Sequence, residues 1–373
     1  MDSLNHDPRS VLHPGETVAE YLDVHGWSQS ELARRTDLTP KTISEICNAK
    51  GPITPATALA FEKVLGRPAH FWLNLQRRYD EAHARVREIA RVEHWRDWAG
   101  RFPLTEMARR GWFAQAPAPG SEVTTLLRFL GVSSPDSWER VWSAAEVSYR
   151  QTRKFTKSIE AISAWVRATE LAAEELSVAE FSRDRLLASI DRFRRLTREP
   201  VDKIMDPAQA LCASIGVALV FIPELPKTGI SGCARWLGSN KVLVALTFRY
   251  KTDDQLWFTF FHELGHVLCQ PSKVGFVVDN PEQDVGDRVV DPEMKRLEDE
   301  ANRFAADTLV PAVPLSAFIK AKDYSSDAIH EFADTIGVGP GIVVGRLQRE
   351  GILAPHQGNA LKQRIDWKLA EEA

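Results

Sequence analysis

The sequence is poor in the features that mark several classes of protein. Its 373 residues include only four cysteines, at positions 47, 212, 233 and 269, and no Cys-x-x-Cys pair. Such spacing favours a reducing cytoplasm and argues against a disulfide framework or a cysteine-bound metal. No apolar run approaches the roughly eighteen residues of a membrane span. The first residues lack the pattern of a signal peptide. We therefore expect a cytoplasmic protein with no membrane part.

An excess of charge of one sign is also missing. The formal net charge is −4, so the chain as a whole gives no electrostatic indication of nucleic-acid binding, and any such function must rest on a local motif. The length is enough for two or three domains with cores of their own. Among the cysteines, Cys233 lies in a predicted strand. It is either a buried structural thiol or a redox or inhibitory thiol.

One short motif carries the most chemical information. His262-Glu263-Leu264-Gly265-His266 places two imidazoles four residues apart, and the apolar pattern of residues 254–269 predicts a helix around them. An i, i+4 pair shares one helix face, so both rings can reach one metal ion. Glu263 can then act as a general base without being a ligand. The alternative is a pair of core histidines with hydrogen-bond partners.

A zinc site of this type needs a third protein ligand. The amphipathic pattern of residues 294–309 predicts a second helix with Ala301 on its inward face. Glu300 precedes Ala301 and is the preferred ligand, with Glu298 as the reserve. Asp307 is a candidate for orienting a ligand histidine. Zinc is the expected metal, although manganese or iron suits the same ligands.

The first ninety residues contain a local motif for DNA. Ser28 to Glu31 is predicted to form a capping box that opens a short helix. Thr39-Pro40 starts a second helix that runs to about Asn48, and Thr54-Pro55 starts the next, which ends at Gly66. Two short helices joined by a tight turn, inside a five-helix bundle, indicate a helix-turn-helix unit. Its predicted core residues are Leu32, Ala33, Ile43, Ile46, Leu59 and Leu65.

The outward positions of the second helix are polar and can contact base edges. They are Lys41, Thr42, Ser44, Glu45 and Asn48. Ser28 and Gln29 begin the first helix and are placed for a phosphate, while Lys50 and Arg34 can add backbone contacts. The alternative is a plain helical bundle used for dimerisation or partner docking.

The rest of the chain predicts a mainly α fold with a small β-sheet, of the α+β class. Residues 91–200 read as a helical middle region. Strands are expected at 217–222, 230–237 and 241–247, and Ser231 to Leu237 is the expected free edge for an extended peptide. We expect four parts: 1–90, the helix-turn-helix domain; 91–200, the helical middle domain; 201–315, the peptidase core; and 316–373, a helical extension. The acidic residues 271–293 are either a mobile lid or a solvated loop.

Two family resemblances follow from these motifs. The stretch from His13-Pro-Gly-Glu-Thr-Val-Ala-Glu-Tyr-Leu to Gly66-Arg-Pro-Ala-His-Phe-Trp-Leu-Asn-Leu-Gln resembles the HigA-type antitoxins of the XRE helix-turn-helix class. This resemblance implies a sequence-specific repressor that binds its operator as a homodimer. It also implies that the helix beginning at Thr39 reads the major groove.

The second resemblance covers about residues 200 to 355. The segments Trp257 to His266, Glu300 to Pro311 and Ile336 to Leu347 resemble the ImmA/IrrE family of metallopeptidases. That resemblance implies a zincin-like, gluzincin-like fold with zinc held by His262, His266 and Glu300, and with Glu263 as base. It further implies that the usual target is a helix-turn-helix repressor.

The leading hypothesis is therefore a cytoplasmic DNA-binding regulator with a zinc-dependent endopeptidase domain. It would cleave a repressor, or itself, to switch gene expression. The second hypothesis is an antitoxin or repressor with a cognate toxin, in which the metal domain is a sensor or a partner-binding scaffold. Cleavage products from the wild type separate the two.

Overall fold

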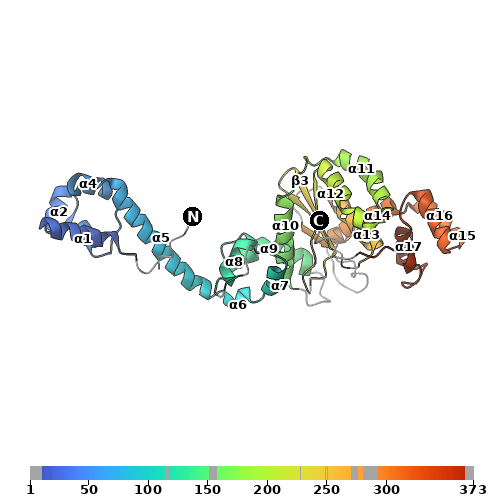
Figure 1. Ribbon diagram of the computed structural model, residues 1–373, viewed down its shortest axis with the longest axis horizontal. Helices are drawn as coiled ribbons and strands as arrows, with labels where there is room; N and C mark the ends of the chain where they lie inside the picture. The colour runs from blue at the N-terminus through green and yellow to red at the C-terminus, as the bar shows by residue number, and fades with distance from the viewer. Residues whose placement is uncertain are drawn as a thin grey trace. The chain divides into compact units, whose positions relative to one another are not determined.

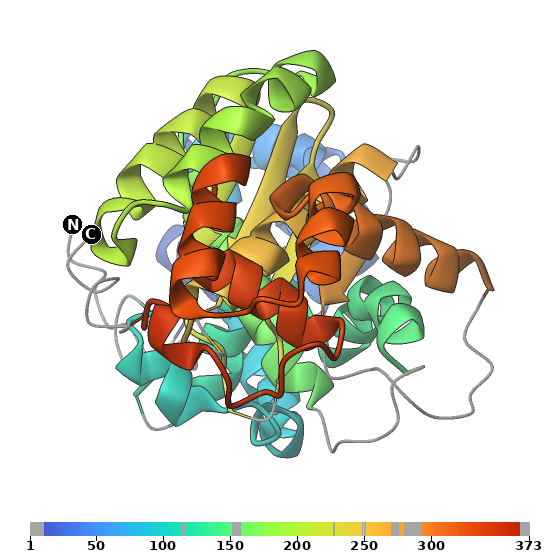
Figure 2. The ribbon, with the colours of Figure 1, turned by 90° about the vertical axis from the view of Figure 1, so that its right-hand side faces the viewer.

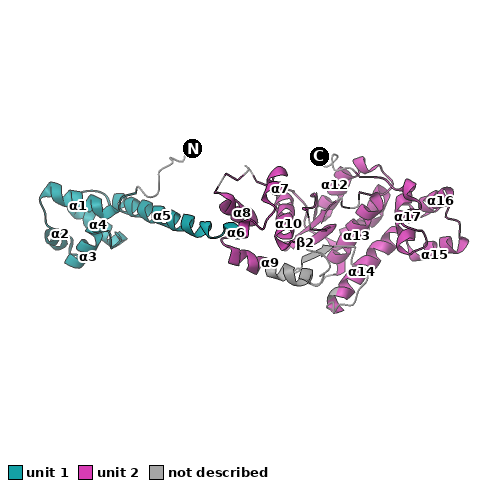
Figure 3. Ribbon diagram, turned by 90° about the horizontal axis from the view of Figure 1, so that it is seen from below, with its two compact units in different colours: residues 1–97 teal, residues 98–373 magenta. Residues whose placement is uncertain are grey.

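The computed structural model describes residues 11–113, 117–118, 120–150, 158–226, 228–247, 249, 251–269, 276–279 and 292–365. Contacts between residues divide the chain into two compact units, residues 1–97 and 98–373, coloured separately in Figure 3. Each unit is described by itself. The division into four parts stays a prediction. Among the described residues no single helix is long and apolar enough to span a membrane, although the bent pair 295–309 and 312–321 passes the same test together.

The first unit is a bundle of five helices, of which α3 is labelled in Figure 3 and the other four in Figure 1. They are α1 (Pro14–His25), α2 (Gln29–Thr36), α3 (Pro40–Cys47), α4 (Pro55–Leu65) and α5 (Ala69–Glu93). The predicted core is confirmed except at Leu59, whose side chain is 52% exposed. Ala58 and Phe61 are fully buried instead, because α4 presents its 58, 61 and 65 face to the other helices.

The predicted helix starts are confirmed, with one difference. Thr39 and Thr54 cap α3 and α4 through their hydroxyls, each followed by a proline at the first helical position. The Ser28 hydroxyl accepts from the backbone N–H of Glu31 at 3.1 Å. The Glu31 carboxylate pairs with Arg34 and Arg35, so only half of the expected capping box is present.

The second unit surrounds one small sheet with helices. Short α6 (Arg96–Ala99) spans the boundary between the units. Then follow α7 (Leu104–Arg109), α8 (Glu122–Leu130), α9 (Pro135–Arg150), α10 (Ile159–Glu174), α11 (Arg183–Leu196), the 3-10 turn η2 (Val201–Lys203) and α12 (Met205–Ile215). The strands are β1 (Val217–Phe221), β2 (Gly232–Leu237), β3 (Lys241–Leu246) and β4 (Phe276–Asp279). Helices α13 (Asp253–Cys269), α14 (Pro292–Leu309), α15 (Ala312–Ala321), α16 (Ser326–Ile336) and α17 (Pro340–Arg349) and the turn η4 (Asn359–Leu361) complete it. The α+β class is confirmed.

The sheet has the order β1-β3-β2-β4. Strand β1 is parallel to β3, whereas β2 is antiparallel to both β3 and β4. Successive side chains of a strand point to opposite faces. On β2, Gly232 faces α13 and Arg235 faces α10, which places these two helices on opposite faces of the sheet. Figure 2 shows the yellow strands behind the red C-terminal helices, with the yellow-green helices beside them. Burial on both faces explains the nearly continuous apolar runs in β1 and β3.

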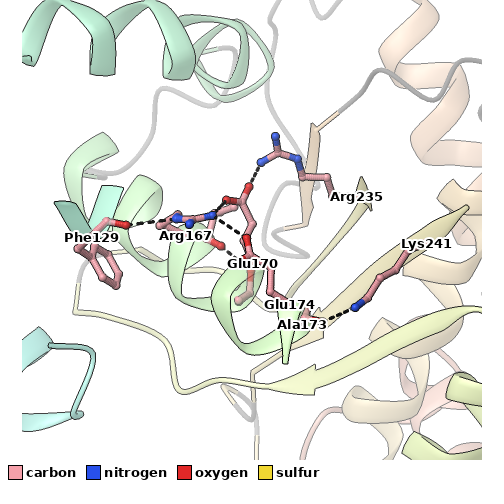
Figure 4. A network of polar contacts seen from close by, with 9 residues as sticks. Phe129, Arg167, Glu170, Ala173, Glu174, Arg235 and Lys241 are labelled. Atoms are coloured by element: carbon pink, nitrogen blue, oxygen red, sulfur yellow. Dashed lines mark hydrogen bonds and ion pairs between the residues drawn. The ribbon is translucent and has the colours of Figure 1, made fainter. Parts of the chain in front are cut away.

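A polar network fastens β2 and β3 to α10 (Figure 4). Glu170, only 9% exposed, pairs with both Arg167 and Arg235, and Arg167 also reaches the Phe129 carbonyl at 3.2 Å. At the end of the same helix, the Lys241 ammonium donates to the carbonyls of Ala173 and Leu176 at 2.5 and 2.7 Å. A buried carboxylate is tolerated because it has two cationic partners.

The last described residues close over the start of α13. We call residues 359–365 the C-terminal clasp. The Lys362 ammonium lies 2.7 Å from the Asp254 carboxylate, and both side chains are buried. The backbone of Gln363 exchanges hydrogen bonds of 3.0 Å with the Asp253 side chain and N–H. The clasp therefore holds the amino end of α13 in place.

Candidate functional site

Helix α13 carries the histidine motif through the centre of the second unit. Its other positions supply a large apolar core that includes Trp257, Phe260 and Phe261. His262, Glu263 and His266 are at most 1% exposed. Three ionisable side chains at such depth are costly unless each has a partner. The predicted helix is confirmed from Asp253 to Cys269.

The two histidines converge on a carboxylate. Their Nε2 atoms lie 2.8 Å apart, and the Glu298 oxygens lie 3.4 Å from Nε2 of His262 and 3.5 Å from Nε2 of His266. Ligands about 2.0–2.1 Å from a tetrahedral zinc ion are roughly 3.3 Å apart. The three donor atoms therefore have the spacing of a metal site, and two imidazoles with one carboxylate suit zinc chemically.

Glu298, the reserve ligand, is the carboxylate that the structure brings to the histidines. The preferred Glu300 lies outside the cluster and pairs with Arg296 at 3.1 Å. The reason is the close contact between α13 and α14. A Cβ atom added to Gly265 would lie 2.9 Å from Cα of Ala301, so Ala301 marks the line of closest approach. A residue three positions earlier shares that helix face, whereas the preceding residue points about 100° away.

The electrostatics of Glu298 agree with this arrangement. Partial burial would raise the pKa of its carboxyl, but hydrogen bonds and charge interactions with His262 and His266 lower that pKa to about 2. Its side chain is 34% exposed, so the cluster has one side toward solvent. A catalytic metal needs an open position for water.

Asn302 is a member of the site that the sequence reasoning missed. Its side-chain oxygen lies 3.1 Å from Nδ1 of His262, the ring nitrogen that faces away from the cluster. Asp307, the residue expected in this role, is 48% exposed and lies 3.9 Å from Arg346 instead. A helical signal was available, because Asn302 follows Glu298 by four residues and so shares its face.

The side chain of Glu263 extends from α13 toward the start of β2. It is fully buried, and a Cβ atom added to Gly232 would come within 2.7 Å of its Oε1. The absence of a side chain at position 232 therefore lets the start of β2 approach this carboxylate closely. Glycine here has a packing role beside Glu263 that the sequence alone did not indicate.

Strand β2 is not the free edge that was expected. Its outer side pairs with β4 in an antiparallel register that sets Gly232 opposite Asp279 and Arg235 opposite Phe276. The prediction failed because β4 is only four residues long and lies within the acidic segment 271–293. The rest of that segment up to Asp291 lies outside the described residues. The prediction of a lid or a solvated loop falls on those residues.

Cys233, next along β2, is 1% exposed. Burial raises the pKa of its thiol well above the ordinary value, and the negative charge of Glu263 raises it further. A thiol that is both inaccessible and hard to ionise is a poor nucleophile. This favours the structural role over the redox role.

The residues predicted to contact DNA lie together on α2 and α3 of the first unit. Lys41 and Asn48 are exposed on α3, and Lys50 follows the helix and is also exposed. Ser28 and Thr39 serve as caps, so their hydroxyls are engaged with the backbone. Lys41 lies 3.8 Å from Glu45. The other residues predicted to contact DNA are half-buried: Gln29, Thr42, Ser44 and Glu45. Their roles stay predictions.

The chain matches two family models. Residues 18–72 match a helix-turn-helix model, and residues 246–348 match the IrrE N-terminal-like domain of the peptidase M78 family. The first match covers α1 to α4 and the start of α5. The second covers both metal-site helices and continues through most of α17.

Several known proteins are similar to about a fifth of this chain. An HTH-type transcriptional regulator of Escherichia coli K12, YddM, is 36% identical over 84 residues, which are 22% of this chain and 84% of that protein. Virulence-associated protein I of Dichelobacter nodosus is 40% identical over 71 residues, or 19% of this chain and 66% of that protein. A solved structure of the antitoxin HigA with the higBA promoter from Pseudomonas aeruginosa is 29% identical, with a TM-score of 0.22 over 22% of this chain and 92% of that one. The chain belongs to the HTH-type transcriptional regulators, and residues 246–348 of its second unit match the IrrE N-terminal-like domain.

Proposed function

We propose that this protein is a DNA-binding transcriptional regulator whose second unit is a metal-dependent endopeptidase. The observation that carries the proposal is the convergence of His262, His266 and Glu298 beside the buried Glu263. A purely structural metal site with these three ligands has no use for a second carboxylate, Glu263, on the same helix as the histidines. Glu263 is the group that such a site needs for hydrolysis.

Each of these residues has a distinct task. His262, His266 and Glu298 would hold the metal, which when bound would supply an acidified water and a polarised carbonyl. Glu263 is the carboxylate proposed to accept a proton from the attacking water. The same carboxyl returns the proton to the leaving amine, so the peptide C–N bond breaks and no net proton is consumed.

The substrate is proposed to be a protein bound in extended form. A peptide can extend a sheet by pairing with a strand at its edge. Because β4 covers β2, the substrate either adds beyond β4 or replaces it. We propose a helix-turn-helix repressor, or this chain's own first unit, as the protein that is cut.

The first unit is proposed to bind operator DNA as a dimer. In this proposal α3 enters the major groove, and Lys41, Thr42, Ser44 and Asn48 face base edges. Substituting Lys41 should weaken binding to all sequences if it contacts a phosphate. The loss should be confined to the operator if it contacts a base.

The test of the peptidase uses Glu263→Gln in the full-length protein. The variant should bind zinc like the wild type but yield no cleavage products by mass spectrometry, either of itself or of purified helix-turn-helix repressors. The matched control is Glu300→Gln, which removes a carboxylate from the neighbouring helix outside the cluster and should leave cleavage intact. Equal cleavage by Glu263→Gln and the wild type would contradict the mechanism. An operator shift without any product from the wild type would favour the sensor or antitoxin function instead.

A further inference from the structure

The two metal-site histidines are held differently by their surroundings. Nδ1 of His262 has the Asn302 oxygen at 3.1 Å, whereas Nδ1 of His266 is buried with no hydrogen-bond partner among the described residues. A neutral histidine that ligates a metal through Nε2 must carry its proton on Nδ1. Only His262 therefore has a neighbour that selects this tautomer.

A third residue determines which way Asn302 faces. Nη2 of Arg349 lies 3.2 Å from the same side-chain oxygen of Asn302. The oxygen and nitrogen of an asparagine side chain are hard to tell apart by position alone, but their hydrogen-bond partners distinguish them. A guanidinium can only donate hydrogen bonds. The atom that faces Arg349 must therefore be the oxygen. Because that oxygen can only accept, the proton between Asn302 and His262 belongs to Nδ1 of the ring.

Arg349 itself is held by an aromatic ring of the metal helix. Its guanidinium carbon lies 4.2 Å from the centre of the Phe258 ring, within the range of a cation–π contact. Phe258 lies four residues before His262 and so shares its helix face. Arg349 is the last residue of α17, whose Gly341 and Gly345 pack against Asp253 and Asp254 at the start of α13. The guanidinium thus spans α17, α13 and α14.

From this geometry we propose that Arg349 is a positioning residue, which fixes the orientation of Asn302 and through it the tautomer and ring plane of His262. The inference rests on the proposed metal site but not on peptidase activity. It makes His262 the histidine whose tautomer is set by a neighbouring side chain before any metal binds. It also connects the C-terminal helices to the metal centre through a contact at the surface.

The test measures metal affinity of the full-length protein, by zinc competition and by the visible absorption of bound Co²⁺. Loss of an outer partner of a ligand histidine lowers metal affinity about 10- to 100-fold, so Asn302→Ala should fall in this range. Arg349→Met acts one contact further away and should cost roughly threefold to tenfold. Arg349→Lys should restore little, because an ammonium lacks the planar fork that stacks and donates together.

A double variant separates positioning from simple destabilisation. If Arg349 acts through Asn302, adding Arg349→Met to Asn302→Ala should change zinc affinity no further. Arg303→Met, an exposed substitution on α14, is the matched control and should bind zinc like the wild type. Thermal unfolding without metal should be the same for the wild type and Arg349→Met. Equal zinc affinity of these two proteins, or additive losses in the double variant, would overturn the inference alone. A wild type that binds no metal would overturn the proposed function as well.

Discussion

At the scale of single residues, the metal centre depends on which carboxylate of α14 faces α13. Residues 298 and 300 are both glutamates, and a separation of two residues turns one of them away from the histidines. Glu298 lies within 3.5 Å of both Nε2 atoms, whereas Glu300 pairs with Arg296. The contact of Gly265 with Ala301 decides between them, because it fixes the line along which the helices meet.

The different positions of Glu298 and Glu300 can be tested by substituting each glutamate separately. Glu298→Gln should lower zinc affinity by a hundredfold or more, an order-of-magnitude expectation for replacing an anionic ligand by a neutral amide. Glu300→Gln should change it by less than about twofold. Competition with a chromogenic chelator measures both. A larger loss in Glu300→Gln than in Glu298→Gln would contradict the ligand set derived from the structure.

The spacing of His262 and His266 was sufficient to predict the helix around them and the approach of their two rings, because an i, i+4 pair has one geometry on a helix. It was not sufficient for the third ligand. The choice between Glu298 and Glu300 depended on the packing of α14, which is set by contacts between residues far apart in sequence. Asn302 and Gly232 were missed for the same reason, since both act on side chains of α13 from another element.

At the scale of elements, α13 begins under unusual electrostatic conditions. Asp253 is 1% exposed, and burial raises the pKa of its carboxyl to about 6, with the charge of Asp254 adding to the effect. The folded protein therefore holds this proton more tightly than the unfolded chain does. Stability from this group is present at low pH and is lost as the pH rises toward 6.

The substitution Asp253→Asn tests whether stability falls with rising pH because of this carboxyl. Between pH 5 and pH 8 the metal-free wild type should lose about 1 kcal/mol of unfolding free energy through this group. The asparagine variant keeps an oxygen that accepts from Gln363 but cannot ionise, so its loss over the same range should be smaller by that amount. Urea unfolding of both proteins at the two pH values measures the difference. Parallel pH profiles would show that Asp253 does not titrate in this range.

Elements differed in how well their sequences predicted them. The strands β1, β2 and β3 and the helices α13 and α14 lie within a few residues of their expected positions, because each has a sustained apolar pattern. Strand β4 was not predicted, since its four residues are too few to show an alternation. The free edge expected at β2 was wrong for that reason.

At the scale of the whole molecule, the division into two units predicts how the chain unfolds. Calorimetry of the full-length protein should show two transitions, one for each unit. If zinc binds the proposed site in the folded second unit, excess zinc should raise one transition and leave the other unchanged. Glu298→Gln should remove most of that response. A single transition that moves as a whole with zinc would mean that the two units unfold together.

The C-terminal clasp affects the order in which parts of the protein fold during its synthesis. Chains emerge from the ribosome with their amino end first, and domains fold as they appear. The helix-turn-helix unit is complete by residue 97, whereas the metal helix receives its buried Lys362 partner only when residues 359–365 have been synthesised. During translation, each nascent chain therefore passes through a stage in which the helix-turn-helix unit has folded and the amino end of α13 has not yet been closed.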